Sequence, residues 1–260
     1  MPPANPNPLF QMVHSDEFQK KRRDGIGNRL FADARTTMEL LSEVGEKIAL
    51  DCGCIKPQSS CIKSRAPWVY YGPLKDRQRA GEKVNGEYGG NWYDLKDVVR
   101  MTIIAPSLKQ LKDVQNKIPQ HCVTQNHMAV IKSTEIFEKV HPCGYSGLIF
   151  VVRLANGRPG ELQVNTSEII YGKEKENVAR PELGQTYYDI KGRYGIECGR
   201  HHVLYEIYRA APAGAIGKEA AQVSKMYLNY LRGHPHPQLL QQLKKALASI
   251  MSKEPSMFRH

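Results

Sequence analysis

The sequence predicts an α+β fold in which a small mixed β-sheet is flanked by helices. Segment 147–154 is apolar and rich in β-branched residues, segment 161–165 alternates polar and apolar residues, and the Asn156-Gly157 turn between them indicates a β-hairpin. The run 97–105 has the composition of a buried strand. Apolar residues at helical spacing dominate both ends of the chain, which predicts helical N- and C-terminal extensions around the sheet.

The elements before the hairpin alternate between helices and strands. Apolar residues between Ser15 and Asp51 recur at helical spacing, whereas glycine and prolines predict an irregular segment over 52–70. Ser107 is a suitable N-cap for the helix that follows the buried strand. In chain order, the elements expected next are a helix over 72–84, a strand over 97–105, a helix over 107–118 and a strand over 128–137.

The chain after the hairpin is expected to be mostly helical. A helix follows Ser167, and loops are expected near Pro181 and Gly192. Further helices are predicted over 200–210, near 217–231 and near 236–252. We therefore divide the chain into a flexible N-terminus (1–13), a helical N-terminal extension (14–69), a central domain (70–210) and C-terminal helices that pack on that domain (211–260).

The chain of 260 residues is strongly basic, with a formal net charge of +11 and a pI near 9.3. Such a surface attracts anions, so nucleotides, nucleic acid and an acidic partner protein are all plausible ligands. No apolar run approaches the length of a membrane span, and the N-terminal residues lack the apolar core of a Sec signal peptide. We expect a soluble protein that, if it is secreted, uses a route without such a signal.

Three of the six cysteines, Cys52, Cys54 and Cys61, lie close together in the sequence. A C-x-C pair followed by a single cysteine lacks the second pair of a structural zinc site. Free thiols in a reducing compartment are the favoured interpretation of this cluster, and a metal site is the alternative.

Lys75, Arg79 and Lys83 are spaced four residues apart, so a helix over 72–84 would carry them on one face. Like charges at this spacing repel one another, and a bound anion would relieve the repulsion. A solvated helix face explains the pattern equally well, and the spacing alone does not decide between the two.

The strand 161–165 carries polar side chains on a single face. Glu161, Gln163 and Asn165 alternate with Leu162 and Val164, so the two sets point to opposite sides of the sheet. Many antiparallel strands have one solvated face, which explains the pattern without any function. The other interpretation is that the three polar side chains line a site.

Further polar groups are expected near the same sheet. Asp97 and Arg100 lie at the entry of the buried strand, and Tyr145 follows Gly144 just before the hairpin. Two carboxylates, those of Asp97 and Glu161, beside several cations suit phosphoryl-type transfer. In such chemistry one acid holds magnesium, the other prepares a hydroxyl, and the cations neutralise phosphate charge.

These groups belong to an ordered set of motifs within roughly residues 70–210: K-x3-R-x3-K, D-x2-R-x-T-I, G-Y, E-x-Q-x-N-T and H-x2-Y-E-x2-R. The set resembles the synthetase domain of the RelA/SpoT family, especially its stand-alone, toxin-like members, which include effectors delivered by type VI secretion. The resemblance implies a nucleotidyltransferase-related fold. It also implies a Mg²⁺-dependent pyrophosphokinase, which transfers the β,γ-pyrophosphate of ATP to a ribose 3′-OH.

The resemblance implies a role for each matching residue. Asp97 would bind magnesium, and Glu161 is a second candidate metal ligand. Glu161 would also orient and activate the attacking hydroxyl, with Gln163 beside it. Tyr145 would stack on the acceptor base and Asn165 would contact the acceptor. The residues that would bind the ATP phosphates are Lys75, Arg79, Lys83 and Arg100.

Structural alternatives exist for several of these residues. Arg100 could serve as a salt-bridge partner of Asp97, and Tyr145 could be an ordinary core residue. His201 and His202 are interpreted as helix packing or a supporting network rather than as catalysts.

Three departures from the family pattern bear on the substrates. Enzymes that make guanosine tetraphosphate usually read G-Y-x-S-x-H and E-x-Q-x-R-T, where this chain has Ile149 and Asn165. The position of a further arginine is occupied by Pro73, for which Arg65 or Arg77 could substitute. We therefore expect adenosine nucleotides as acceptors, giving (p)ppApp-type products. The 3′ end of tRNA and guanosine nucleotides are the alternatives.

Such an enzyme would be a growth-inhibiting toxin that acts in the cytoplasm of a target cell. It would need an immunity protein or antitoxin, expected to be acidic to match the basic surface. The non-enzymatic alternative is a basic RNA-binding module, although no RNA-binding motif is recognisable. Its phosphate contacts would be Lys20, Lys21, Arg22, Arg23, Lys244 and Lys245.

Overall fold

The computed structural model describes residues 25–54, 69–72, 74–124, 128–135 and 141–254. The predicted flexible N-terminus lies outside these ranges, as do the basic run 20–23, Cys61 and Arg65. Residues 25–32 are helical and lead into the first labelled element. The labelled elements are α3 (Ala34–Asp51), β1 (Val69–Tyr71), α4 (Arg77–Glu87), η1 (Trp92–Asp94), β2 (Arg100–Ala105), α5 (Leu108–Thr124), β3 (Ala129–Glu135), β4 (Leu148–Arg153), β5 (Pro159–Thr166), α6 (Ser167–Lys173), α7 (Glu176–Leu183), α8 (Gln185–Tyr194), α9 (Arg200–Ala210), α10 (Ala215–Arg232) and α11 (Pro237–Lys253).

The strands form one mixed sheet in the order β1-β2-β5-β4-β3. Strands β2 and β5 are parallel, and every other neighbouring pair is antiparallel. The predicted hairpin is the β4–β5 pair, whose connecting turn contains Gly157 with φ +75°. The α+β fold with a small mixed sheet and flanking helices is confirmed.

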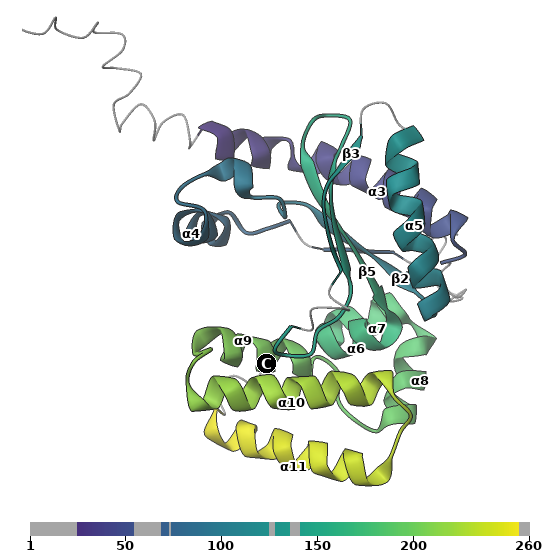
Figure 1. The fold of residues 1–260 in the computed structure, drawn as a ribbon, viewed down its shortest axis with the longest axis vertical. Helices are drawn as coiled ribbons and strands as arrows, with labels where there is room; N and C mark the ends of the chain where they lie inside the picture. The colour runs from purple at the N-terminus through teal and green to yellow at the C-terminus, as the bar shows by residue number, and fades with distance from the viewer. Residues whose placement is uncertain (1–24, 55–68, 73, 125–127, 136–140, 255–260) are drawn as a thin grey trace, which may run out of the picture.

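Two hydrophobic cores hold the molecule together. The first core lies where α3 and α5 pack on β2 and β5, and it includes Met101 and Leu162. The second core lies among α6 to α11 and, within the described residues, includes Ile104 near the far end of β2. Figure 1 shows α3 and α5 beside the sheet in the upper part of the view and the α6–α11 helices below it.

Several boundaries differ from those predicted. Pro181 and Gly192 lie inside α7 and α8 rather than in loops. Burial of Ala179 and Leu183 in the second core keeps α7 helical around its proline, and a single exposed glycine costs a helix only about 1 kcal/mol. Helix α5 continues past Pro119 to Thr124.

Two further corrections concern the region before β2. The segment 52–70, predicted to be irregular, contains the start of edge strand β1, which pairs antiparallel with β2. Helix α4 starts only at Arg77, because the Asp76 side chain accepts a hydrogen bond from the Arg79 N–H and caps the helix. Lys75 therefore precedes the helix and does not share its face with Arg79 and Lys83.

No helix within the described ranges is long and apolar enough to cross a membrane.

Candidate active site

The alternation predicted for the hairpin strand is present in β5. Leu162 and Val164 are fully buried in the first core, so Glu161, Gln163 and Asn165 point to the opposite face of the sheet. On the neighbouring parallel strand, the residues in register with these three are Arg100, Thr102 and Ile104. Because Ile104 belongs to the second core while Arg100 is exposed, this face is covered at one end and open at the end that holds Glu161.

Hydrogen bonds connect the polar residues of this face. The Gln163 amide nitrogen donates to Glu161 Oε1 over 2.7 Å, and the Tyr145 hydroxyl donates to Asn165 Oδ1 over 3.0 Å. The Lys173 ammonium group, at the end of α6, donates to Gln163 Oε1 over 2.9 Å. The fold thus joins Tyr145 to Asn165, and Lys173 through Gln163 to Glu161.

Asp97 is held by two lysines rather than by Arg100. Its Oδ2 lies 2.7 Å from Lys75 Nζ and 3.2 Å from Lys83 Nζ. Burial alone would raise the pKa of Asp97, but the hydrogen bonds and positive charges of Lys75 and Lys83 lower it below its usual value. Asp97 Oδ1 is buried and has no hydrogen-bond partner, which leaves one carboxylate oxygen for a ligand.

The two arginines predicted to bind phosphate are both exposed, and Arg100 is in register with Glu161 at the open end of this face. Arg79 lies on α4 and Arg100 at the start of β2, and within the described residues neither forms an ion pair. The Arg100 side chain lies against Gly72, where an added Cβ would meet its Cγ at 2.6 Å. Arg77 instead donates to Asn28 Oδ1 and lies over the Phe31 ring, so it is engaged with the N-terminal helical segment.

A buried histidine supports Tyr145, as the supporting-network interpretation of His201 anticipated. The rings of Tyr145 and His201 are stacked with centroids 5.8 Å apart. The Ser224 hydroxyl donates to the Cys143 carbonyl, so its oxygen accepts from His201 Nδ1 over 2.7 Å. Burial, with help from the nearby charge of Lys173, lowers the pKa of His201 to about 3, and the imidazole is therefore neutral. His202 is exposed.

The turn before Tyr145 depends on a glycine. Gly144 has φ +74°, and a Cβ at this position would come within 2.6 Å of the Lys225 Cα in α10. The Gly144 carbonyl accepts a hydrogen bond from Arg232, also on α10. The C-terminal helices therefore fix the loop that presents Tyr145.

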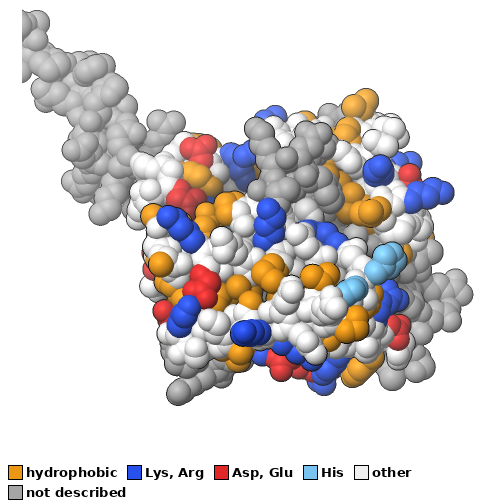
Figure 2. Space-filling model, turned by 60° about the horizontal axis from the view of Figure 1, so that its bottom comes forward, with side chains coloured by type: hydrophobic (Ala, Val, Ile, Leu, Met, Phe, Trp, Pro, Cys, Tyr) orange, Lys and Arg blue, Asp and Glu red, His pale blue; other side chains and the backbone are white. Residues whose placement is uncertain are grey.

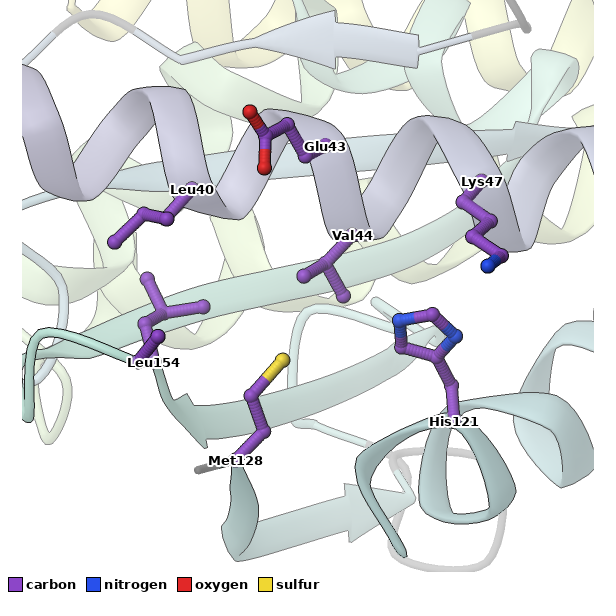
Figure 3. Close-up of a pocket in the computed structure, with 8 residues that line it drawn as sticks. Leu40, Glu43, Val44, Lys47, His121, Met128 and Leu154 are labelled. Atoms are coloured by element: carbon purple, nitrogen blue, oxygen red, sulfur yellow. The ribbon is translucent and has the colours of Figure 1, made fainter. Parts of the chain in front are cut away.

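Two cavities in the described part of the structure lie away from the carboxylates of this face. A cavity of about 220 Å³ lies between α3 and the opposite side of the sheet, with Glu43, Lys47 and His121 among its lining residues (Figure 3). A cavity of about 590 Å³ lies where the start of α5 meets α6 and α10, and Ser146 and Arg232 line it. Neither of these two cavities is lined by Asp97 or Glu161.

The remaining sequence predictions concern thiols and surface charge. Cys52 and Cys54 are unpaired, and burial raises the pKa of the Cys54 thiol to about 12. Lys244 and Lys245 are exposed on α11. On the face of the molecule drawn in Figure 2, Lys and Arg side chains are interspersed with hydrophobic and acidic ones and do not form one continuous basic patch.

Sequence reasoning missed two contributors to the site, Lys173 and Ser224. Lys173 lies on the helix that directly follows β5, so its closeness to Gln163 could have been anticipated from the strand-to-helix connection. Ser224 lies on α10, 79 residues after Tyr145, and no local pattern connects it to the loop.

No family model matches the sequence. The chain is 34% identical over 162 residues to the (p)ppApp synthetase toxin Tas1 of Pseudomonas aeruginosa (strain UCBPP-PA14), an alignment that covers 62% of this chain and 35% of that protein. The chain thus spans about a third of the length of this curated relative.

Among solved structures, the chain is similar to the type VI effector Tas1 in complex with its immunity protein. The similarity has a TM-score of 0.61 at 28% sequence identity and covers 79% of this chain and 95% of that one. The small alarmone synthetase 1 from Bacillus subtilis, bound to its product pppGpp, matches more weakly, with a TM-score of 0.45 at 12% identity. The sequence motifs, the mixed sheet and the similarity to Tas1 agree with one another, and the chain resembles the synthetase domain of the RelA/SpoT family.

Proposed function

We propose that this chain is a Mg²⁺-dependent pyrophosphokinase that transfers the β,γ-pyrophosphate of ATP to the 3′-OH of a purine nucleotide. The observation that supports it best is the register of the parallel strands, in which Glu161 on β5 lies opposite the exposed Arg100 on β2. Asp97, with its two lysines, lies three residues before Arg100. Glu161 would activate the hydroxyl, Asp97 would bind the metal, and the cations near them would bind the phosphates.

In this reaction Glu161 accepts the proton of the acceptor 3′-OH. The freed oxygen bonds to the β-phosphorus of ATP, the bond between that phosphorus and the α,β-bridging oxygen breaks, and AMP leaves with the bridging oxygen. The hydrogen bond from Gln163 to Glu161 Oε1 leaves Oε2 of the same carboxylate for the acceptor hydroxyl. Lys75, Arg79, Lys83 and Arg100 would bind the triphosphate and neutralise the charge that develops on the leaving group.

A magnesium ion fits the free oxygen of Asp97. Within the described residues no group of three or more His, Cys, Asp or Glu side chains could hold a metal alone. Mg²⁺ commonly binds one or two carboxylates together with the phosphate oxygens of a nucleotide, so the buried, unpartnered Oδ1 of Asp97 meets that requirement. Glu161 is the second candidate ligand. When bound, the ion would neutralise charge on the phosphates.

We propose adenosine nucleotides as the acceptors, with (p)ppApp-type products. The relative that resembles this chain over 162 residues is itself a (p)ppApp synthetase. Tyr145, held by His201 and Asn165, would stack on the acceptor base. Asn165, which stands where guanosine-specific enzymes usually have arginine, is fully buried and would act on the acceptor through its hydrogen bond with Tyr145.

We further propose that the protein is a secreted toxin that acts in a target cell and is neutralised by an immunity protein. The supporting observation is the similarity to a type VI effector that was solved in complex with its immunity protein. The net charge of +11 favours an acidic partner surface.

The test is a transfer assay with γ-labelled ATP, Mg²⁺ and, separately, AMP, ADP, ATP, GDP, GTP and bulk tRNA. We expect label to appear on the adenosine nucleotides, and Glu161→Gln to lower the rate at least about 100-fold. Glu39→Gln is the matched control, because Glu39 is exposed on α3, which covers the opposite face of the sheet. Transfer only to tRNA or to guanosine nucleotides would contradict the proposed acceptor. Salt-sensitive RNA binding without ATP consumption would refute the enzyme.

A further inference from the structure

We propose that Lys173 is a positioning residue for the catalytic carboxylate, acting on Glu161 through the side chain of Gln163. The inference rests on the proposed pyrophosphokinase activity and names a residue outside the motif set that supported it. Lys173 is the last residue of α6, and its side chain is 24% exposed.

The contacts fix the orientation of the Gln163 amide. Lys173 Nζ lies 2.9 Å from Gln163 Oε1, and Gln163 Nε2 lies 2.7 Å from Glu161 Oε1. An ammonium group can only donate hydrogen bonds and an ionised carboxylate can only accept them. The amide must therefore present its oxygen to Lys173 and its NH₂ group to Glu161. If the amide were rotated by 180°, its oxygen would face the carboxylate, which also only accepts, and its NH₂ group would face the ammonium, which also only donates.

The position of Gln163 makes this orientation important. Gln163 is 8% exposed and lies on β5, which is between β2 and β4 in the sheet. The residue in register on β4 is Ile149, whose side chain has no polar group. A buried amide that loses a partner pays a desolvation cost, so removal of the Lys173 ammonium would weaken the preference that keeps the NH₂ group on Glu161.

The Lys173 ammonium is itself held in place. Glu174 Oε1 lies 3.3 Å from Lys173 Nζ, and the Glu174 N–H donates to the Ile170 carbonyl at the end of α6. The Glu174 carbonyl packs against Gly199, where an added Cβ would lie 2.9 Å from its oxygen. Helix α6 begins directly after β5, so only strand and helix residues separate Lys173 from Glu161 in the chain.

The kinetic experiment compares Lys173→Met, Lys173→Arg and Gln163→Leu in the full chain, with ATP and ADP as substrates. We expect Lys173→Met to lower kcat by about 10- to 100-fold, because small displacements of a catalytic group cost rates of this order. KM for each nucleotide should change less than about threefold, and Lys173→Arg should restore most of the rate. Lys253→Met is the matched control, because it also removes a lysine that pairs with a glutamate, here Glu219. Lys253 lies on α11, and this helix is on the far side of α10 from the sheet (Figure 1).

A double-mutant cycle tests whether Lys173 acts through Gln163. In a Gln163→Leu background, Lys173→Met should cause little further loss, because the group that transmits its effect is already absent. If the two effects instead multiply, or if Lys173→Met raises the acceptor KM and leaves kcat unchanged, Lys173 binds substrate directly and the inference is wrong.

A measurement without turnover separates this inference from the proposed function. The side-chain ¹H–¹⁵N signals of Gln163, assigned by their loss in Gln163→Leu, should be two sharp, well-separated resonances in the wild type. They should broaden or converge in Lys173→Met but not in Lys253→Met. If the wild type transfers no pyrophosphate and these changes occur, the function fails while the positioning contact holds. Unchanged signals would overturn the positioning role even in an active enzyme.

Discussion

Gly144→Ala tests whether α10 fixes the loop that presents Tyr145. Alanine at φ +74° costs about 1–2 kcal/mol because its Cβ crowds its own backbone. In addition, the Cβ would lie 2.6 Å from the Lys225 Cα, a backbone atom of a packed helix that cannot rotate away. Overpacking of this kind typically costs about 1–3 kcal/mol. Gly144→Ala should therefore destabilise the protein by about 2–5 kcal/mol.

Gly157→Ala is a control for the backbone term alone. Gly157 has φ +75°, almost the same as Gly144, but an added Cβ would meet nothing within 4 Å. This variant should lose only about 1–2 kcal/mol. The difference between the two variants isolates the contact with α10.

Urea denaturation of both variants and of the wild type measures the two costs. Because the loop carries Tyr145, Gly144→Ala should also raise the acceptor KM more than the ATP KM, whereas Gly157→Ala should change neither. Equal stability of the two variants would show that α10 does not restrain the loop and would refute the steric argument.

Three further predictions follow from the polar contacts. The pKa of Asp97 is lowered in the folded state, so its ion pairs stabilise the protein fully at pH values above the unfolded-state pKa. That stabilisation is lost as the pH falls through the folded-state pKa. The difference in unfolding free energy between the wild type and Asp97→Asn, measured in urea, should therefore shrink between pH 6 and pH 3. Ser224→Ala leaves the buried His201 Nδ1–H without its acceptor and should cost about 1–3 kcal/mol in thermal unfolding. Arg79→Ala should raise the ATP KM about tenfold in the transfer assay, an effect absent in Arg35→Ala on the exposed side of α3.

The sequence by itself determined the features that depend on local periodicity and turn chemistry. The alternation along β5 separates Glu161 and Gln163 from Leu162, because neighbouring side chains of a strand must point to opposite faces. The hairpin around Gly157 and the helix over 200–210 were equally predictable, since both rely on short-range signals. The ordered motifs indicated the resemblance to RelA/SpoT synthetases, and the similarity to Tas1 agrees with it.

Only the tertiary structure decided how those residues are supported. Lys75 lies outside α4 and yet pairs with Asp97, a contact that the helical-stripe prediction could not supply. Ser224 and His201, which hold the loop of Tyr145, come from separate helices, α10 and α9. Helix α7 persists around Pro181 because its neighbours are buried in the second core. Contacts between distant segments depend on how elements pack, and that information is not present in the spacing of residues along the chain.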